Sequence, residues 1–380
     1  MPAPASGQAP LPPITLVVPG PIDQRTGGYR YDACLLRELR ALGHPVELVE
    51  LPGAYPYPDE AARARASERL AAMPDGSIVL VDALAGSVLP ELMRHEARRL
   101  RPVALVHHPL ALETGLSEAQ AASLAGQERE ALAAMRHVVC TSADTAGTLG
   151  GYGVPPERIT VAEPGTDPAP LARGRVGEGV EEGAGEGVGS GTDAGPFRLL
   201  CIATVTPRKG HTLLVDALAR LRERRPALAW RLDLIGSLER APDTVRTLRE
   251  AIGAHRLDDV ITLHGEQDDA TIAAGYARAD AFVLASWHEG YGMVLAEALA
   301  RGLPIVATRG GATVDTVPGD AGLLVDTGDV SGLSDALETL LGDPARRRAL
   351  RAGARAARGR LPRWIDTARR VSAALTSIGE

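Results

Sequence analysis

Two glutamates eight residues apart are the sharpest chemical feature of this sequence. Glu289 lies in the string SWHEGYGMVLAE, which begins at Ser286, and Glu297 closes it. A glycine-bracketed loop leading into a helix offers unpaired backbone N–H groups and the positive end of a helix dipole, which suits anionic or hydroxyl-rich ligands. Along a helix the two carboxylates are about 12 Å apart at about 1.5 Å per residue, close to the hexose-to-ribose separation in a nucleotide-sugar. Alternatively, Glu289 caps the helix and Glu297 lies on a solvated face.

The single lysine of the chain is the second feature. Of 41 basic residues one is lysine, and asparagine is absent, which a high-GC coding bias explains. This residue, Lys209, lies in the segment TVTPRKG (204–210), between an apolar strand pattern and the helix pattern HTLLVDALARL. The dipole of a helix disfavours cations at its N-terminus. An anionic ligand therefore explains the positions of Arg208 and Lys209 better than the alternative that both cations merely lie at the N-terminus of a helix.

Strands that alternate with helices must position these residues. Apolar runs predict strands at 14–18, 46–51, 77–84, 102–108, 137–142 and 158–165, and again at 197–204, 230–237, 260–265, 281–286, 304–308 and 322–326. This alternation indicates an α/β protein with two doubly wound domains, each built on a parallel sheet covered on both faces. Ligands of such sheets bind outside the carboxyl ends of the strands, so two facing domains would share a ligand cleft.

The glutamate pair, with EGYG at its first member, resembles the signature of the family-4 glycosyltransferases, which have the two-Rossmann-domain GT-B fold. In that family the first glutamate contacts hydroxyls of the donor sugar and the second holds the ribose. The resemblance assigns these roles to Glu289 and Glu297. The family's backbone after the first glutamate also reaches the sugar, and the matching positions here are Gly290, Tyr291, Gly292, Met293 and Val294.

The segment at 204–210 is similar to the family's PRKG segment, whose lysine contacts the donor diphosphate. Negative charge develops on that diphosphate when its bond to the anomeric carbon breaks, and a preorganised cation stabilises the charge. Many members also carry an arginine in a Gly-Arg pair a few residues earlier. That place holds Ala203-Thr204 here, so we expect Arg208 to share the diphosphate with Lys209.

The first domain offers a glycine pair and a histidine pair. Gly27 and Gly28 lie between the first strand and the first helix, where the family's glycine-rich loop faces the donor diphosphate and the acceptor. Alone, such a pair marks only a turn. His107 and His108 end the strand PVALV, where the family often has a histidine near the donor sugar. His107 fits the register better, His108 remains an alternative, and a structural strand cap is the competing interpretation.

Weaker matches complete the predicted site and the domain plan. Gly236, Ser237, His264 and Gly265 match strand ends that line the family's nucleotide pocket, mostly through backbone. The plan has a tail at 1–12, an acceptor-side Rossmann-like domain at 13–172, a flexible glycine-rich linker at 173–195, a donor-nucleotide domain at 196–361, and a helix at 362–380 that crosses back to the first domain.

Composition excludes several other classes of protein. The 380 residues are 45% hydrophobic and 23% charged, which indicates a globular chain rather than a disordered one. A net charge of −7 gives no electrostatic footprint for nucleic acid, and membrane association is not indicated. Cys34, Cys140 and Cys201 lie far apart in apolar strings and are expected as buried free thiols. Because no signal peptide and no long apolar run is found, we expect a cytoplasmic protein.

Metal and cofactor motifs are missing from the sequence. It contains no Asp-x-Asp, no HExxH and no Cys/His cluster. We therefore expect no metal and no cofactor, with the nucleoside-diphosphate sugar as a co-substrate and a small-molecule or lipid-linked acceptor.

The resemblance implies a retaining, nucleotide-sugar-dependent glycosyltransferase. The family's front-face displacement needs no covalent nucleophile, because the leaving phosphate itself helps to deprotonate the acceptor. Two alternatives stay open. One is another GT-B enzyme, either a sugar-nucleotide epimerase or a glycosyl phosphorylase. The other is a two-lobed sugar-binding protein, which would normally carry an export signal and more sugar-stacking aromatic residues.

Overall fold

The computed structural model describes residues 11–174 and 195–379 and divides the chain into two compact units. The first comprises residues 1–112, 116–165 and 362–380, and the second comprises residues 113–115 and 166–361. Each unit carries a six-stranded parallel sheet, so the predicted α/β class with two doubly wound parallel sheets is confirmed. The predicted linker at 173–195 falls almost wholly outside the described residues, as does most of the tail at 1–12.

The strands of the first unit match the apolar runs of the sequence. They are β1 (Ile14–Pro19), β2 (Val46–Leu51), β3 (Ile78–Asp82), β4 (Arg101–Val106), β5 (His137–Cys140) and β6 (Ile159–Val161). The helices and short 3₁₀ turns are α1 (Gly27–Ala41), α2 (Glu60–Ala71), α3 (Ala83–Gly86), α4 (Pro90–Glu96), η1 (Leu110–Leu112), α5 (Glu118–Ala134), α6 (Ala143–Gly151), η2 (Pro156–Arg158) and α14 (Trp364–Gly379).

The first sheet has the strand order β2-β1-β3-β4-β5-β6. Strands β1 and β3 are buried along their whole length, as continuous apolar runs predict for the centre of a parallel sheet. The chain goes from β1 to one side of the sheet and then returns to the other side, so the order reverses between β1 and β3. The carboxyl ends of these two strands therefore flank the switch point where doubly wound sheets bind ligands.

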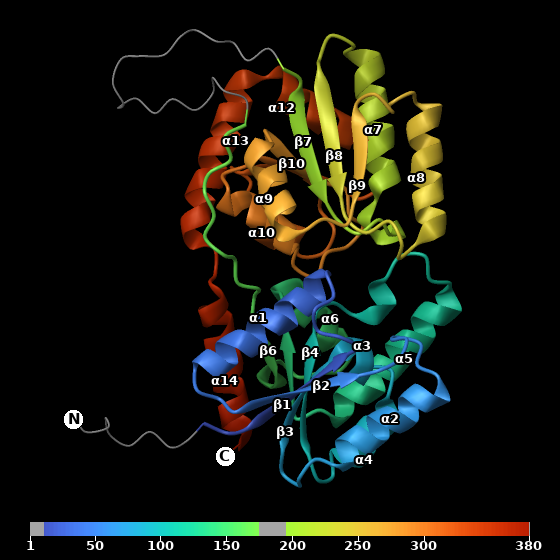
Figure 1. Cartoon of the computed structure of the whole chain (residues 1–380), viewed down its shortest axis with the longest axis vertical. Helices are drawn as coiled ribbons and strands as arrows, with labels where there is room; N and C mark the ends of the chain where they lie inside the picture. The colour runs from blue at the N-terminus through green and yellow to red at the C-terminus, as the bar shows by residue number, and fades with distance from the viewer. Residues whose placement is uncertain (1–10, 175–194, 380) are drawn as a thin grey trace, which may run out of the picture. The chain divides into compact units, whose positions relative to one another are not determined.

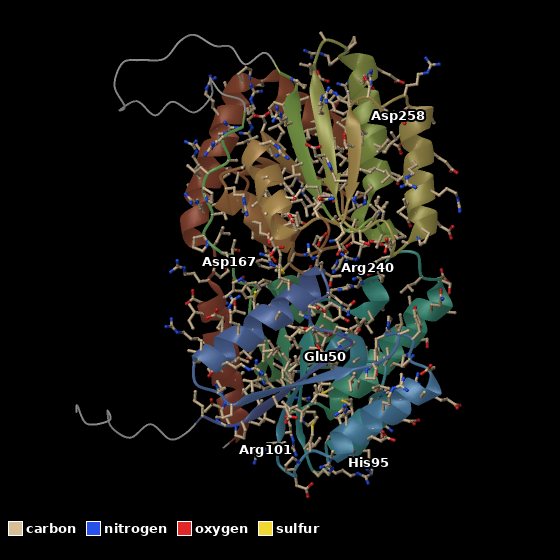
Figure 2. The ribbon with its side chains drawn as sticks, in the orientation of Figure 1. Glu50, His95, Arg101, Asp167, Arg240 and Asp258 are labelled. Atoms are coloured by element: carbon tan, nitrogen blue, oxygen red, sulfur yellow. The ribbon has the colours of Figure 1, made fainter. Side chains whose placement is uncertain are left out.

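Helix α14 packs against the first unit. Figure 1 shows it beside α1, although the two helices come from opposite ends of the chain. The Trp364 ring meets Tyr31 edge to face at a centroid distance of 5.7 Å. At the other end of α14, Arg101, labelled in Figure 2, donates hydrogen bonds to the carbonyls of Ile378 and Gly379. The arginine thus caps carbonyls that the last turn of a helix leaves unpaired.

The second unit repeats the pattern of strand and helix. Its strands are β7 (Phe197–Ile202), β8 (Trp230–Ile235), β9 (Ile261–Gly265), β10 (Ala281–Leu284), β11 (Ile305–Thr308) and β12 (Gly322–Val325). The helices and turns are η3 (Pro207–Lys209), α7 (His211–Arg224), α8 (Pro242–Ala254), α9 (Asp269–Arg278), α10 (Met293–Ala300), α11 (Thr313–Thr316), α12 (Val330–Gly342), α13 (Pro344–Ala357) and η4 (Arg358–Arg360).

The second sheet has the order β12-β11-β10-β7-β8-β9, which is the Rossmann order with its reversal between β7 and β10. Figure 1 shows β7, β8 and β9 running side by side in one direction. One buried apolar cluster joins this sheet to its covering helices. Among the described residues, no helix combines the length and the apolar character that crossing a bilayer would require.

Candidate active site

The carboxyl ends of β7 and β10 bring the two motifs of the second unit together. These strands pair directly, and the loops that follow them leave the sheet at its switch point. Lys209 Nζ lies 2.6 Å from Glu289 Oε1, and Arg208 Nη1 lies 3.9 Å from Glu289 Oε2. Two segments that are 80 residues apart in sequence therefore form one charged cluster.

Gly210 makes the close approach of these loops possible. Its φ of +60° lies in the left-handed region, and a Cβ at this position would lie 2.0 Å from the carbonyl oxygen of Ala285. The backbone N–H of Trp287 also donates to the carbonyl of Arg208 at 2.8 Å. Both conformation and space therefore require glycine here.

The guanidinium of Arg208 is held by two groups of the second unit. Its Nε lies 3.1 Å from both carboxylate oxygens of Glu113, and its Nη1 donates to the carbonyl of His288 at 2.7 Å. Sequence reasoning missed Glu113, which lies in a loop without any motif. The arginine that we expected to share a diphosphate is thus already paired with a carboxylate.

Electrostatics keep the Lys209–Glu289 pair ionised. Burial would raise the pKa of Glu289, but the positive charges of Lys209 and Arg208 outweigh that effect and lower the pKa below its ordinary value. Burial lowers the pKa of Lys209, and the negative charge of Glu289 offsets part of this change. The two side chains are only 16% and 6% exposed, so each supplies the counter-charge that the other needs.

A glycine pair after β11 supports the glutamate loop. The backbone N–H of Glu289 donates to the carbonyl of Gly310 at 3.2 Å, and Glu289 forms an isolated parallel bridge with Gly311. A Cβ on Gly310 would lie 2.5 Å from the Trp287 carbonyl, and one on Gly311 would lie 2.4 Å from the Glu289 carbonyl. Sequence reasoning missed this pair, although two adjacent glycines one residue after a strand were a usable signal.

Helix α10 positions the second glutamate. Gly292 caps its start with φ of +83°. Glu297 Oε2 accepts a hydrogen bond of 2.9 Å from the hydroxyl of Tyr276, and the Arg301 guanidinium lies 4.1 Å from the centre of that tyrosine ring. Sequence reasoning missed Tyr276 as the partner that the glutamate needs among apolar neighbours. The remaining residues of the predicted sugar-contacting stretch are half-buried, namely Gly290, Tyr291, Met293 and Val294.

The four weaker positions fall at the ends of β8 and β9. The N–H of Gly236 donates to the carbonyl of Gly265, and the carbonyl of Ser237 accepts from Val205, so this corner adjoins the lysine loop through backbone. A Cβ on Gly236 would lie 2.0 Å from the Ala203 carbonyl. His264 Nε2 lies 2.6 Å from Asp233 Oδ1, and both side chains are more than one third exposed.

In the first unit, the predicted glycine pair and His107 come together. Helix α1 begins at Gly27, so the pair forms the first turn of the helix rather than the loop before it. A Cβ on Gly28 would lie 3.1 Å from Cδ2 of His107, which shows how closely the backbone packs on the ring. The loop before α1 is anchored by Glu50, labelled in Figure 2, which accepts a hydrogen bond from the N–H of Ile22 at 2.8 Å.

His107 belongs to a buried cluster that sequence reasoning missed. Its Nε2 lies 3.0 Å from Asp32 Oδ1 and 3.8 Å from Asp82 Oδ2. The aspartates are 0% and 3% exposed. Burial would lower the pKa of His107, but Asp32 and then Asp82 outweigh it and raise the pKa to about 9. Burial, followed by the charge of Asp32, raises the pKa of Asp82 to about 8.

The same cluster has the spacing of a metal site. One ligand atom from each of the three side chains lies within 4.8 Å of the others, and no second such group is found among the described residues. We identify it as a hydrogen-bonded cluster, because His107 Nε2 already makes a direct bond to Asp32. His108, the alternative at this strand end, is half-buried.

Comparison with protein families places both units in one group. Residues 27–170 match the family described as Glycosyltransferase Family 4, and residues 196–343 match the family described as Glycosyl transferases group 1. The chain is 34% identical over 281 residues to a D-inositol 3-phosphate glycosyltransferase of Pseudarthrobacter chlorophenolicus, with 70% of this chain and 62% of the relative covered. A relative of the same name from an Arthrobacter species is 35% identical over 266 residues, covering 66% and 60%. The chain thus spans about three fifths of the length of these relatives.

Solved structures share the fold across both units. Sucrose-phosphate synthase from Thermosynechococcus elongatus aligns with a TM-score of 0.77 at 20% identity, covering 95% of this chain and 98% of that one. HepE from Anabaena, solved in complex with UDP and glucose, aligns with a TM-score of 0.71 at 16% identity, covering 96% and 99%. These likenesses confirm the predicted GT-B fold. The two family matches show that the chain belongs to the family-4 glycosyltransferases.

Proposed function

We propose that this chain is a retaining hexosyltransferase that moves a sugar from a nucleoside-diphosphate sugar to an acceptor hydroxyl. The observation that carries the proposal is the Lys209–Glu289 pair at the switch point of the second sheet, with Arg208 beside it. Two cations next to a carboxylate can bind both parts of such a donor. The cations pair with the diphosphate oxygens, and the carboxylate accepts hydrogen bonds from the sugar hydroxyls.

Donor binding exchanges the partners of this cluster. The phosphate oxygens of the donor replace Glu289 as the partner of Lys209, and they replace Glu113 as the partner of Arg208. The carboxylate of Glu289 then accepts hydrogen bonds from the sugar hydroxyls. Gly292 and the start of α10 add backbone N–H groups and the positive end of a helix dipole. The cations are preorganised where negative charge develops as the bond between sugar and diphosphate breaks.

The transfer step uses no protein nucleophile. The bond from the anomeric carbon to the diphosphate oxygen breaks, and the acceptor oxygen forms its bond to that carbon from the same face. The acceptor proton passes to the oxygen of the leaving phosphate. The products are a glycoside with unchanged anomeric configuration and a nucleoside diphosphate, which Lys209 and Arg208 stabilise.

The rest of the donor extends over the second unit. Glu297, oriented by Tyr276, holds the ribose hydroxyls. The backbone at Gly236, Ser237 and Gly265 lines the base. A uridine donor is the first to test, because HepE was solved in complex with UDP and glucose.

The acceptor belongs to the first unit, where Gly28 and His107 lie at the carboxyl ends of its strands. The curated relatives are named for D-inositol 3-phosphate, so a phosphorylated polyol is the first small-molecule acceptor to test. We further propose that catalysis needs no metal ion, because Lys209 and Arg208 supply the charge that a divalent cation would otherwise contribute.

The test measures release of UDP from UDP-hexoses, with and without acceptor, in excess EDTA and in added Mg²⁺. We expect acceptor-dependent turnover in EDTA, and an axial anomeric linkage retained in the product. Lys209→Met should remove this turnover, whereas Arg249→Met, an exposed cation on α8, should not. Epimerised donor or phosphate-dependent turnover would favour the rival GT-B activities. Turnover only with Mg²⁺ would overturn metal independence.

A further inference from the structure

The Asp32–Asp82–His107 cluster contains more acidic groups than a hydrogen-bonded histidine requires. Asp32 Oδ1 bonds to His107 Nε2, whereas Asp32 Oδ2 is buried without a partner among the described residues. Asp82 Oδ1 accepts from the N–H of Leu84 at 2.7 Å as the cap of α3, and its Oδ2 faces His107. Two carboxylates that share one buried site cannot both stay ionised without further compensation.

A shared proton resolves this arrangement. A proton on the Asp82 carboxyl, donated towards Asp32, gives Asp32 Oδ2 the partner that it lacks. The pair then carries a single negative charge, and the imidazolium of His107, 3.0 Å from Asp32, neutralises it. The buried cluster is then neutral overall, which removes most of the cost of burying charge.

This arrangement leaves one nitrogen of His107 for a ligand. The ring is 18% exposed, and among the described residues its Nδ1 has no hydrogen-bond partner, because the contacts of the ring with Asp32 and Asp82 both fall on Nε2. Gly28 packs on the Cδ2 edge of the ring, and the Thr141 hydroxyl donates to the backbone carbonyl of His107. The ring is therefore fixed with Nδ1 as its available polar atom.

We propose that Asp32 and Asp82 are positioning residues that share one proton and hold His107 as an imidazolium, which leaves its Nδ1–H to donate a hydrogen bond to an oxygen of a ligand bound at the first unit. That this ligand is the acceptor rests on the proposed function, whereas the charge state of the cluster does not. His107 then stabilises negative charge and does not act as the base that deprotonates the acceptor.

Neighbouring groups from other elements do not provide a competing charge within the cluster. From α1, Tyr31 meets the His107 ring edge to face at 5.2 Å, and burial raises its pKa well above the ordinary value. From β5, burial raises the pKa of Cys140 to about 12. Both groups are therefore neutral near pH 7. Arg370 of α14 is cationic, acts on Tyr31, and is paired with Glu163 at 3.7 Å.

The charge state can be measured on the unliganded full chain by ¹⁵N NMR with labelled histidine, using His107→Gln to assign the signals. At pH 7.5 we expect both ring nitrogens of His107 to show imidazolium shifts, with a titration midpoint near 9. Asp32→Asn should move that midpoint down by two units or more, and Asp82→Asn should move it less. Asp216→Asn, which removes an exposed carboxylate beside another histidine, His255, should leave the His107 midpoint unchanged.

Three outcomes would overturn the inference. A neutral His107 at pH 7.5 in the wild-type protein contradicts it without any variant, so misfolding of a variant cannot hide the result. An unchanged titration midpoint of His107 in a folded Asp32→Asn protein would mean that Asp32 is not the group that keeps His107 protonated. Loss of the imidazolium signal with stoichiometric Mn²⁺ or Zn²⁺ would make the cluster a metal site.

Kinetics then test the hydrogen bond from His107 to the ligand of the first unit. In the wild-type enzyme kcat/KM should fall as pH rises through about 9, and in Asp32→Asn the same limb should begin at lower pH. His107→Gln should lower kcat/KM roughly ten- to a hundredfold, as loss of a charge-assisted hydrogen bond does. If the imidazolium is present but no nucleotide-sugar is turned over, the proposed function fails while the charge state stands. If turnover occurs without this alkaline limb, the hydrogen bond from His107 to the ligand of the first unit is refuted.

Discussion

Lys209 Nζ lies 2.6 Å from Glu289 Oε1, so the only lysine of the chain is paired with a buried glutamate before any ligand arrives. The pair affects the stability of the fold, and we propose that its lysine also acts in catalysis. Substitutions can separate these two effects. Removing the lysine leaves the carboxylate with Arg208 alone at 3.9 Å. Removing both charges leaves no buried carboxylate to compensate.

Lys209→Met should therefore lower turnover by about 10²–10³-fold and lower the free energy of unfolding by about 3–5 kcal/mol, because it breaks a buried ion pair. The double variant Lys209→Met with Glu289→Gln should recover most of that stability and none of the turnover. Denaturant unfolding and steady-state kinetics on the same preparations measure both effects. Recovery of turnover in the double variant would refute the diphosphate role of Lys209.

Glu297 should act mainly on nucleotide binding. Glu297→Ala removes the carboxylate proposed to hold the ribose, and we expect UDP affinity to fall about tenfold, as loss of one charged hydrogen-bond acceptor predicts. Tyr276→Phe keeps the ring beneath Arg301 but loses the hydrogen bond that orients Glu297, so its loss of affinity should be smaller. Calorimetric titration with UDP checks both variants, and equal affinities in all three proteins would exclude the ribose role.

Glu113 should compete with the donor for Arg208. Its carboxylate lies 3.1 Å from Arg208 Nε, and the diphosphate must displace it. Glu113→Gln removes the charge but keeps the size of the side chain, so UDP should bind a few-fold more tightly. Glu118→Gln, an exposed residue on the first turn of α5, is a matched control. Weaker UDP binding in Glu113→Gln would show that Glu113 supports the site rather than competes for it.

The sequence predicted the strands and both motifs, because continuous apolar runs and glycine-bracketed loops are local signals. It could not predict the partners. The contacts of Glu289 with Lys209 and of Arg208 with Glu113 join segments 80 and 95 residues apart, and only the order of strands in the sheet brings them together. Asp32 was missed because one acid in a helix pattern normally lies on a solvated face.

The local sequence pattern also predicted the start of helix α1 wrongly. Gly27 and Gly28 predict a loop, because glycine weakens a helix interior. Helix α1 nevertheless starts at Gly27. The cost of glycine is small in a first turn, and a side chain at Gly28 would press on the His107 ring at 3.1 Å. The packing of the backbone against the His107 ring, rather than the helix propensity of glycine, therefore determined where the helix begins.

Glu128 should make the first unit less stable at alkaline pH. It is buried, accepts from the N–H of Leu110 and from the Ser87 hydroxyl, and burial raises its pKa from 4.5 to about 7. A raised folded-state pKa means that the folded protein holds the proton longer than the unfolded chain does. Its contribution is therefore full below about pH 4.5 and is lost as pH rises through about 7.

Glu128→Gln removes this titration. Relative to the wild-type protein, the variant should gain stability between pH 5 and pH 8, by at most about 3 kcal/mol for a shift of this size. Denaturant unfolding at the two pH values measures the difference, and comparison with the wild-type protein cancels the pH dependence of Asp82 and His107. A constant difference between variant and wild type across this range would contradict the raised pKa.

Two glycines of the second unit should tolerate no side chain, for the same reason that they shape the site. Gly210 and Gly236 have φ of +60° and +154°, and a Cβ on either would lie 2.0 Å from a backbone carbonyl oxygen that cannot move freely. Alanine at either position must displace the loop that carries Lys209, so we expect the free energy of unfolding to fall by several kcal/mol together with loss of UDP binding.

Gly253→Ala is the control, because a Cβ on this exposed helical glycine would meet nothing within 4 Å. Alanine there should leave the stability unchanged or raise it by up to about 1 kcal/mol. Wild-type stability in Gly210→Ala would mean that the two loops do not depend on the close approach between Gly210 and Ala285.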